Sequence, residues 1–362
     1  MRPETFALSA LALILELSAP SASLSFQRNY EEFSRGPYGY QLPLRRPQGI
    51  YTGSSDARET KVQQHAPWGL ARISHRDSLN ENTRDEYLYD ASGTTDVNVY
   101  VINTGVNVFH PDLRGRVLLG KNTAGLGFSI DRDGEGTHVA GTIAGTFNGV
   151  AKKANIIAVK AMQTTADANI TDVLAGLRWA TDHHKHHQTL GHLPRASVAV
   201  LHLPPPPRPG MPGTVDAAIL AGIHVVLPAG NANLEIACPA EGAPNGNAIV
   251  AAASNVQDEK AGFSNYGPCI DIFAPGSEIA SAGYNLGSGL SVKSGTEMAA
   301  AHVAGLIAYL LGLRRKHGIF DTPEGMKKLI AEVATEGVLK LEGNSTFNVS
   351  VHCPLKGKVL LC

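Results

Sequence analysis

Short apolar runs alternate with longer helical stretches through the middle of the sequence. The apolar runs cover 97–102, 156–159, 198–201, 225–227 and 249–253. A strand that is apolar at every position is buried on both faces, which is typical of a parallel sheet with helices on both sides. This alternation excludes most other architectures, and the sequence therefore predicts an α/β fold.

The stretches between these runs predict the helices that cover the sheet. They lie at 137–145, 171–182, 214–222, 296–313 and 323–335. A chain of 362 residues with 43% hydrophobic residues can bury one large core, or two at most. We expect one domain from residue 61 to 340, followed by a tail at 341–362. In such a sheet, ligands and catalytic groups collect beyond the carboxyl ends of the strands.

The N-terminus has the pattern of a secretory signal peptide at residues 1–23. Arg2 is followed by an apolar run at 6–17 and by small residues around Ser21 and Ser23. A frayed terminal helix is the alternative. Residues 24–60 are rich in Arg, Tyr, Gly and Pro without an apolar period, so we expect a disordered or vestigial pro-segment. The protein is expected to be secreted and extracellular.

Charge and hydropathy exclude two classes of partner. The 31 basic and 32 acidic residues leave a net charge of −1, which provides no electrostatic footprint for nucleic acid. The N-terminal apolar run is too short to span a bilayer, and no later run is long enough. We expect no nucleic-acid partner, no membrane partner and a monomeric protein.

A secreted protein can form disulfides and carry glycans, so its cysteines and glycosylation sequons are relevant. An even number of cysteines in an oxidising compartment favours two disulfides. The cysteines are Cys238, Cys269, Cys353 and Cys362. The sequons begin at Asn169, Asn344 and Asn348, where glycans are expected.

Three short segments follow predicted strands or begin predicted helices. They are "VYVINTGVNVFHPDL" from Val99, "DGEGTHVAGTIAG" from Asp133 and "SGTEMAAAHVAG" from Ser294. Together with "APWGLARIS", "GVAKKANIIAVK", "PAGNANLEIACPA" and "FSNYGPCIDIFAPGSEI", they resemble the subtilisin-like serine proteases, most closely the proteinase K branch. The resemblance implies a three-layer fold with a mostly parallel sheet and helices on both faces. By descent alone it also implies a serine endopeptidase.

The catalytic positions depart from the family pattern. Active members carry the Asp of Asp-Thr-Gly, the first His of His-Gly-Thr-His and the Ser of Gly-Thr-Ser-Met-Ala, where this chain has Asn103, Glu135 and Glu297. The general base and the nucleophile are both lost, and no imidazolium remains for a carboxylate to stabilise. The resemblance places the oxyanion-hole side chain at Asn231. We therefore expect a degenerate triad, a pseudoprotease with no functional catalytic residue.

The two glutamates leave three alternatives open. By resemblance Glu135 and Glu297 face each other across the cleft, so the pair could share a proton as a carboxyl dyad. They could also bind a divalent metal. The third alternative, which we expect, is that the helix dipole holds Glu297 while Glu135 faces solvent. No metal site or cofactor is predicted.

The peptide-binding groove also differs from the family. The backbone that follows the strand at 198–201 pairs with a peptide in active members, but proline has no N–H to donate to such a ladder. The opposite wall is rich in glycine in the family. The altered groove positions are Leu203, Pro204, Pro205, Pro206, Ala166 and Ala168. A glycan on Asn169 would lie at the same rim.

Several other features receive a structural interpretation. The histidine-rich stretch at 182–192 is expected to be a solvated loop, with metal chelation as the alternative. His138 and His302 are interpreted as packing residues. The resemblance implies a Cys238–Cys269 disulfide, whereas Cys353 and Cys362 have no family counterpart. A structural calcium is doubtful because Asn255 replaces an aspartate ligand of proteinase K.

The sequence thus favours a secreted, catalytically inactive subtilisin-fold protein that acts by binding. A protein partner could engage Pro204–Pro207, because a run of prolines is preformed as a polyproline II ligand. A hydrolase that uses Glu135 and Glu297 as a dyad, or with a metal, is the alternative. Fewer than forty residues follow the signal before the domain, which is short for the folded propeptide of active relatives.

Overall fold

The computed structural model describes most of the predicted domain. The described residues are 60–125, 127–189, 195–204, 208–236, 246–284, 289–340 and 349–350. The predicted signal peptide, residues 24–59 of the predicted pro-segment and most of the C-terminal tail lie outside them.

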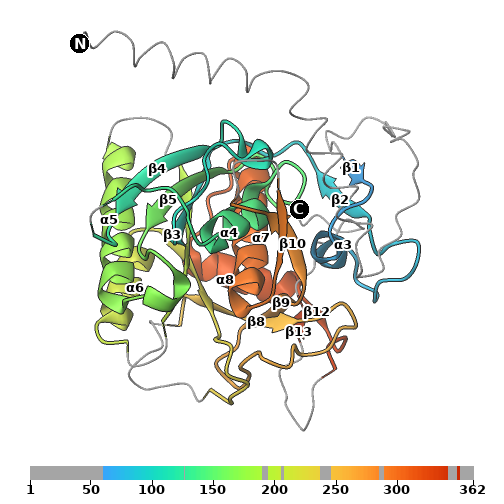
Figure 1. The fold of residues 1–362 in the computed structure, drawn as a ribbon. Helices are drawn as coiled ribbons and strands as arrows, with labels where there is room; N and C mark the ends of the chain where they lie inside the picture. The colour runs from blue at the N-terminus through green and yellow to red at the C-terminus, as the bar shows by residue number, and fades with distance from the viewer. Residues whose placement is uncertain are drawn as a thin grey trace, which may run out of the picture.

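A nine-stranded sheet forms the centre of the described structure (Figure 1). Its order is β12-β13-β9-β8-β7-β6-β3-β5-β4, and the β12–β13 pair alone is antiparallel. The strands are β3 (Val97–Asn103), β4 (Val117–Asn122), β5 (Asn155–Lys160), β6 (Ala196–Leu201), β7 (Ile223–Pro228), β8 (Ile249–Ser254), β9 (Ile272–Pro275), β12 (Thr335–Glu336) and β13 (Val349–Ser350). The predicted parallel α/β architecture is confirmed.

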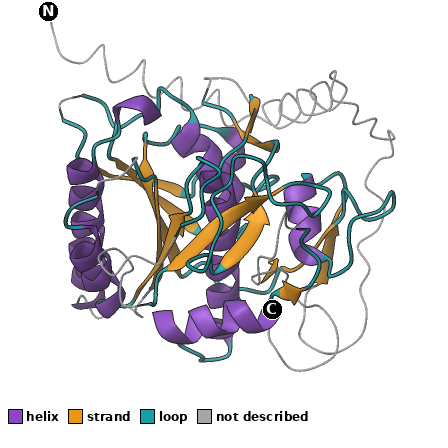
Figure 2. Ribbon diagram, turned by 90° about the horizontal axis from the view of Figure 1, so that it is seen from below, coloured by secondary structure: helices purple, strands orange, loops and turns teal. Residues whose placement is uncertain are grey.

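Helices cover both faces of this sheet, as the two views show (Figures 1 and 2). They are α3 (Trp68–Ser74), α4 (Glu135–Ala144), α5 (Ile170–Thr189), α6 (Met211–Leu220), α7 (Thr296–Lys316) and α8 (Pro323–Val333). Helices α5 and α6 pack on one face, and α4, α7 and α8 pack on the other. Two small antiparallel sheets pair β1 (Thr60–Gln63) with β2 (Tyr87–Asp90) and β10 (Ile279–Ala282) with β11 (Leu290–Lys293).

Strand β3 shows why the sheet needs cover on both sides. Successive side chains of a strand point to opposite faces. Val97, Val99 and Val101 lie in the core beneath α4 and α7, whereas Tyr100 and Ile102 lie in the core beneath α5 and α6. All five are at most 1% exposed. The continuous apolar run in the sequence is therefore the direct result of burial on both faces.

Helix α7 contributes more buried residues than any other helix of the described structure. Among the described residues it is the one helix that is long and apolar enough to cross a membrane by length and composition. Within its most apolar window, however, 89% of the residues are buried inside the protein. This burial is typical of the core helix of a globular domain, and small residues from Ala299 to Ala301 let α7 approach the sheet closely.

The sequence misplaced some element boundaries. Helix α5 continues to Thr189, so the histidines at 183–187 lie in a helix and not in the predicted solvated loop. Strand β4 was missed because it is an edge strand whose Leu118 and Leu119 are more than half exposed, which breaks the pattern of a buried run. Helix α4 begins two residues earlier than predicted, which places Glu135 in its first turn.

The strand order changes direction around β3. The chain passes from β3 to edge strand β4 and then through α4 to β5 on one side, and it crosses through α5 to β6 on the other side. The carboxyl ends of β3 and β6 are therefore neighbours, and the backbone N–H of His202 donates to the carbonyl of Ile102 at 3.0 Å. Such a switch point is where open α/β sheets bind ligands.

Gly136 allows α4 to begin directly against the loop that follows β3. A Cβ at this position would lie 1.9 Å from the carbonyl oxygen of Gly105, a backbone atom that cannot move aside easily. Gly213 in α6 makes a matched comparison, because a Cβ there would meet nothing within 4 Å.

We expect Gly136→Ala to lower the free energy of unfolding by at least about 2 kcal/mol, because the added methyl overpacks a backbone contact. Gly213→Ala should raise it by up to about 1 kcal/mol through better helix propensity. Urea unfolding of both variants checks this pair. Equal effects of the two substitutions would show that the α4–β3 contact is not tight.

Candidate functional site

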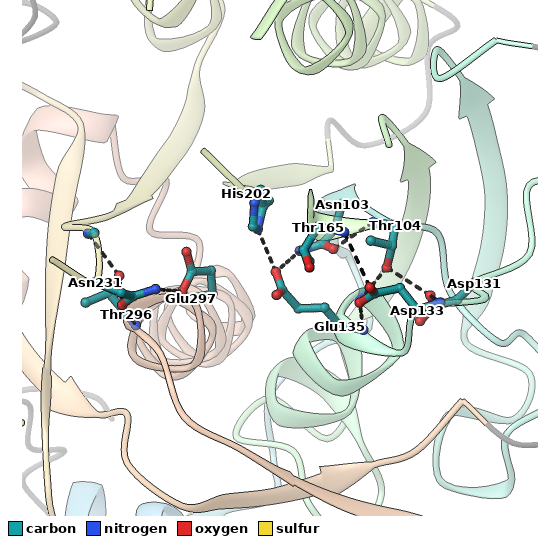
Figure 3. Close-up of polar contacts among 12 residues, drawn as sticks. Asn103, Thr104, Asp131, Asp133, Glu135, Thr165, His202, Asn231, Thr296 and Glu297 are labelled. Atoms are coloured by element: carbon teal, nitrogen blue, oxygen red, sulfur yellow. Dashed lines mark hydrogen bonds and ion pairs between the residues drawn. The ribbon is translucent and has the colours of Figure 1, made fainter. Parts of the chain in front are cut away.

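The candidate site lies where β3 ends and where α4 and α7 begin. Asn103 is the last residue of β3, Glu135 is the first residue of α4, and Glu297 is the second residue of α7. Figure 3 shows the two glutamates extending from the first turns of neighbouring helices, with His202 on the side of Glu135. The structure thus brings together the positions that the sequence motifs singled out.

Glu135 is bonded on two sides through the same carboxylate oxygen. The Asn103 side-chain amide donates to Oε1 at 2.9 Å, and Nδ1 of His202 lies 2.7 Å from the same atom. The side chains of Glu135 and His202 are 13% and 9% exposed. The contact is therefore a largely buried ion pair when His202 is protonated, with an amide hydrogen bond beside it.

Two aspartates fix the loop that leads into α4. Asp131 accepts from the backbone N–H of Gly134 at 2.8 Å and of Thr137 at 2.8 Å, while Asp133 accepts from the N–H of Glu135 at 3.2 Å. Gly134 stands before the helix with φ 98°, a left-handed conformation that glycine adopts without strain. These bonds satisfy free N–H groups of the first turn and set the direction of Glu135.

Glu297 is held by Asn231. The Asn231 amide donates to Oε2 of Glu297 at 2.9 Å, while its own oxygen accepts from the N–H of Thr296 at 2.8 Å. Glu297 is only 8% exposed. Asn231 therefore orients the first turn of α7 and the carboxylate together.

The electrostatics give the two glutamates opposite pKa shifts. Burial raises the pKa of Glu135, but the hydrogen bond and charge of His202 outweigh it, so the pKa lies below its usual range. Burial raises the pKa of Glu297, the charge of Glu135 raises it further, and Asn231 opposes both only in part. Burial lowers the pKa of His202, yet Glu135 and then Glu297 reverse this and leave the pKa above its usual value.

One expectation about this site is wrong. Glu135 was expected to face solvent, but it is enclosed by Asn103 and His202 because α4 starts beneath the ends of β3 and β6. Glu297 was expected to be held by the helix dipole; it lies in the first turn of α7, and the side-chain amide of Asn231 also binds it in a buried position. The sequence also missed His202. Its position directly after the predicted strand at 198–201 was a signal, because that end of a strand faces the site.

The hydroxyl groups around the site are engaged elsewhere. Thr296 donates to the Asn231 oxygen at 3.0 Å, and the Ser294 hydroxyl accepts from the N–H of Glu278 at 2.8 Å. In the described part of the chain, neither hydroxyl is hydrogen-bonded to a histidine. The arrangement can hold and exchange protons among Glu135, His202 and Glu297, but it pairs neither the Ser294 nor the Thr296 hydroxyl with a base.

The predicted groove residues differ in how deeply they are buried. Leu203 and Pro204 are buried, and the Arg208 side chain donates to the Pro204 carbonyl at 2.8 Å. Ala166 is exposed and Ala168 is half-buried. Pro205, Pro206 and Pro207 lie outside the described residues.

The predicted glycan position on the rim is well exposed. The side-chain oxygen of Asn169 accepts from the N–H of Thr171 at 2.9 Å, at the start of α5. The amide nitrogen of Asn169, the atom to which a glycan is attached, takes no part in this bond. Asn344 and Asn348 lie outside the described residues.

The residues around Asn255 do not fit the doubtful calcium site. The Asn255 side-chain oxygen accepts from the N–H groups of Gln257 and Glu259, at 3.0 and 2.9 Å, so it is directed at its own loop. In the described ranges, no group of three or more His, Cys, Asp and Glu residues is placed to hold a metal ion.

The remaining predicted residues are partly described. His138 and His302 are at most 1% exposed and bind the carbonyls of Ile279 and Met298, and burial lowers the pKa of each to about 4, in agreement with a packing role.

Cys269 is disulfide-bonded. Cys238, Cys353 and Cys362 lie outside the described residues, so the predicted Cys238–Cys269 pairing stays a prediction.

Solved structures with the same arrangement define the class of fold. A crystal structure of a cold adapted subtilisin-like serine proteinase superposes with a TM-score of 0.68 at 32% sequence identity, covering 81% of this chain and 100% of that one. The fold is thus subtilisin-like. The family model for the subtilase family matches residues 94–348, and the chain belongs to this family.

Curated relatives agree with this assignment. Alkaline protease 2 of Aspergillus fumigatus is 42% identical over 290 residues, which cover 77% of this chain and 58% of that protein. Subtilisin-like serine protease Rho m 2.0101 of Rhodotorula mucilaginosa is 41% identical over 292 residues, covering 78% of this chain and 84% of the relative. The chain thus spans little more than half the length of some of its relatives.

We expect Glu297→Gln to stabilise the protein, and the gain should grow with pH. A carboxyl whose folded pKa is raised contributes stability below its unfolded pKa, and that stability is lost as pH rises through the folded pKa. Gln does not ionise, yet its oxygen still accepts from Asn231. Each unit of raised pKa is worth about 1.4 kcal/mol.

Urea unfolding from about pH 4 to about pH 8 measures this gain. The exposed Glu324, whose pKa is lowered by Lys328, provides the control variant Glu324→Gln, which should show no gain with pH. A gain for Glu297→Gln that stays constant or falls as pH rises would contradict the raised pKa.

Proposed function

We propose that this chain is a secreted, catalytically inactive member of the subtilase family that acts by binding. The observation that carries the proposal is the hydrogen bond from the Asn231 amide to the Glu297 carboxylate, 2.9 Å long. By motif resemblance these are the oxyanion donor and the position of the nucleophile. The Glu297 carboxylate thus occupies one N–H of this amide, and a developing oxyanion would have to displace the carboxylate or use the second N–H.

The other catalytic positions support the same proposal. Glu135 takes the place of the general base, but its low pKa and its ion pair with His202 make it a weak proton acceptor. Asn103 donates to Glu135 and brings no charge of its own. Acyl transfer through an enzyme hydroxyl requires a nucleophile paired with a base, and Asn103, Glu135 and Glu297 provide no such pair.

For the binding role we propose a protein partner at Pro204–Pro207. Pro204 is itself buried and tied to Arg208, so a partner would contact the prolines beyond it. The signal-like residues 1–23 and the exposed sequon at Asn169 support secretion. Neither a nucleic-acid nor a membrane partner is part of the proposal, and the protein is proposed to act as a monomer without a cofactor.

A hydrolase that uses two carboxyl groups is the second candidate. It is favoured by one observation: the environment pushes the pKa values of Glu135 and Glu297 apart. A pair of carboxyls with separated pKa values can divide the roles of acid and base. In this mechanism Glu297 would donate a proton and Glu135 would accept one from water.

Hydrolysis of denatured casein distinguishes the two candidates. From about pH 3 to about pH 9, with and without divalent metals, we expect no release of peptides above the buffer rate, because no nucleophile is activated. An active subtilisin-like protease is the positive control. Activity that is lost in the Glu135→Gln/Glu297→Gln double variant but kept in Glu324→Gln would establish the carboxyl enzyme and overturn the binding proposal.

Rebuilding the triad tests whether the groove is impaired as well. Asn103→Asp with Glu135→His and Glu297→Ser restores the family residues and frees the Asn231 amide. We expect the triple variant to react with a small fluorophosphonate probe, which needs no groove. It should cleave extended peptides at least about a hundredfold more slowly than an active relative, because prolines cannot hold the substrate in register. Cleavage at the rate of the relative would show that the groove is intact.

A further inference from the structure

Two histidines on α5 face each other at a distance that suits a metal ion. His183 and His187 are one helical turn apart, so their side chains lie on the same face of the helix. Their Nε2 atoms are 3.1 Å apart. Two nitrogen ligands about 2.0–2.1 Å from one ion, at bond angles of 90–110°, stand about 2.9–3.4 Å apart. The observed spacing falls within that interval.

The neighbouring His184 takes no part in the pair, because hydrogen bonds occupy both of its nitrogens. His184 Nε2 lies 3.1 Å from the Ala221 carbonyl, which can only accept, so His184 carries its proton there. The Gln188 amide also contacts this nitrogen and can present its oxygen to it. Nδ1 of His184 is then an acceptor, and the Ser197 hydroxyl donates to it at 2.8 Å.

Tyr100 occupies the other nitrogen of His183. The Tyr100 phenol oxygen lies 2.9 Å from Nδ1 of His183, so Nε2 is the nitrogen that faces His187. With a metal ion on Nε2, His183 would carry its proton on Nδ1 and donate it to the phenol oxygen. A metal-bound histidine in proteins commonly has such a partner on its other nitrogen.

The surroundings favour a rigid and accessible pair. Trp179 stacks on the His183 ring with centroids 4.8 Å apart, and Tyr100 meets that ring edge-on at 5.8 Å. His187 is exposed, so an ion can enter from solvent. Imidazole ligands suit Cu²⁺, Ni²⁺ and Zn²⁺ and not the oxygen-seeking Ca²⁺ or Mg²⁺.

We propose that Nε2 of His183 and Nε2 of His187 form a two-histidine site for a divalent transition-metal ion at the solvent-exposed edge of α5. Water molecules complete the coordination, because within the described ranges no third His, Cys, Asp or Glu joins the pair. The site lies on the sheet face opposite α4 and α7 and does not depend on the proposed function of the cleft.

Titration of the full-length chain with Cu²⁺, followed by tryptophan fluorescence, tests the site. The chain has two tryptophans, Trp68 and Trp179, and Trp179 stacks directly on a proposed ligand. We expect saturable quenching with an endpoint at one equivalent of Cu²⁺. Loss of an outer-shell partner already costs about 10- to 100-fold in metal affinity, so His187→Ala should weaken binding at least about tenfold.

His186→Ala is the matched control, because His186 is an exposed neighbour on the same helix outside the pair. It should change the affinity less than about twofold. Circular dichroism confirms that both variants fold. Equal titrations of the wild type and His187→Ala overturn the site, as does an equal loss in both variants, which would mean nonspecific binding by the whole tract.

Discussion

The register between β3 and β6 is the constraint on which the site depends. Ile102 of β3 pairs with Leu201 of β6. The next residues, Asn103 at the end of β3 and His202 just after β6, therefore lie side by side. Strand β3 must stay in this register because its alternate side chains fill two different cores. A shift of one residue would exchange the two sets and expose each to the wrong packing partners. The positions of Asn103 and His202 thus follow from the burial of the β3 side chains that precede Asn103.

The same constraint acts on the two glutamates through the helices. Helix α4 packs against α7, and both lie on one face of the sheet with their N-termini near the switch point. Free N–H groups at these ends favour negative charge. Two carboxylates placed there repel each other, and His202 relieves the repulsion by pairing with Glu135. Glu297 has a neutral amide partner instead, and this asymmetry gives the two acids opposite pKa shifts.

The residues that hold this fold together are separate from those at the catalytic motif positions. The close approach of Gly136 to Gly105, the buried small residues of α7 and the loop bonds of Asp131 position the cleft, yet none of these residues is part of a triad. Packing selects residues of this kind whatever the cleft does. A fold therefore does not imply a function, and the function has to be argued from the site itself.

The sequence by itself determined the α/β class, the order of its main strands and helices, and the motif positions Asn103, Glu135 and Glu297. These follow from local signals, because apolar periodicity and short motifs are read within a few residues. The partners of those residues were decided only by tertiary structure. His202 reaches Glu135 across 67 residues of sequence, and Asn231 reaches Glu297 across 66. The enclosure of Glu135 was therefore mispredicted as exposure, because burial in a cleft depends on which strand ends become neighbours, and no local pattern encodes that pairing.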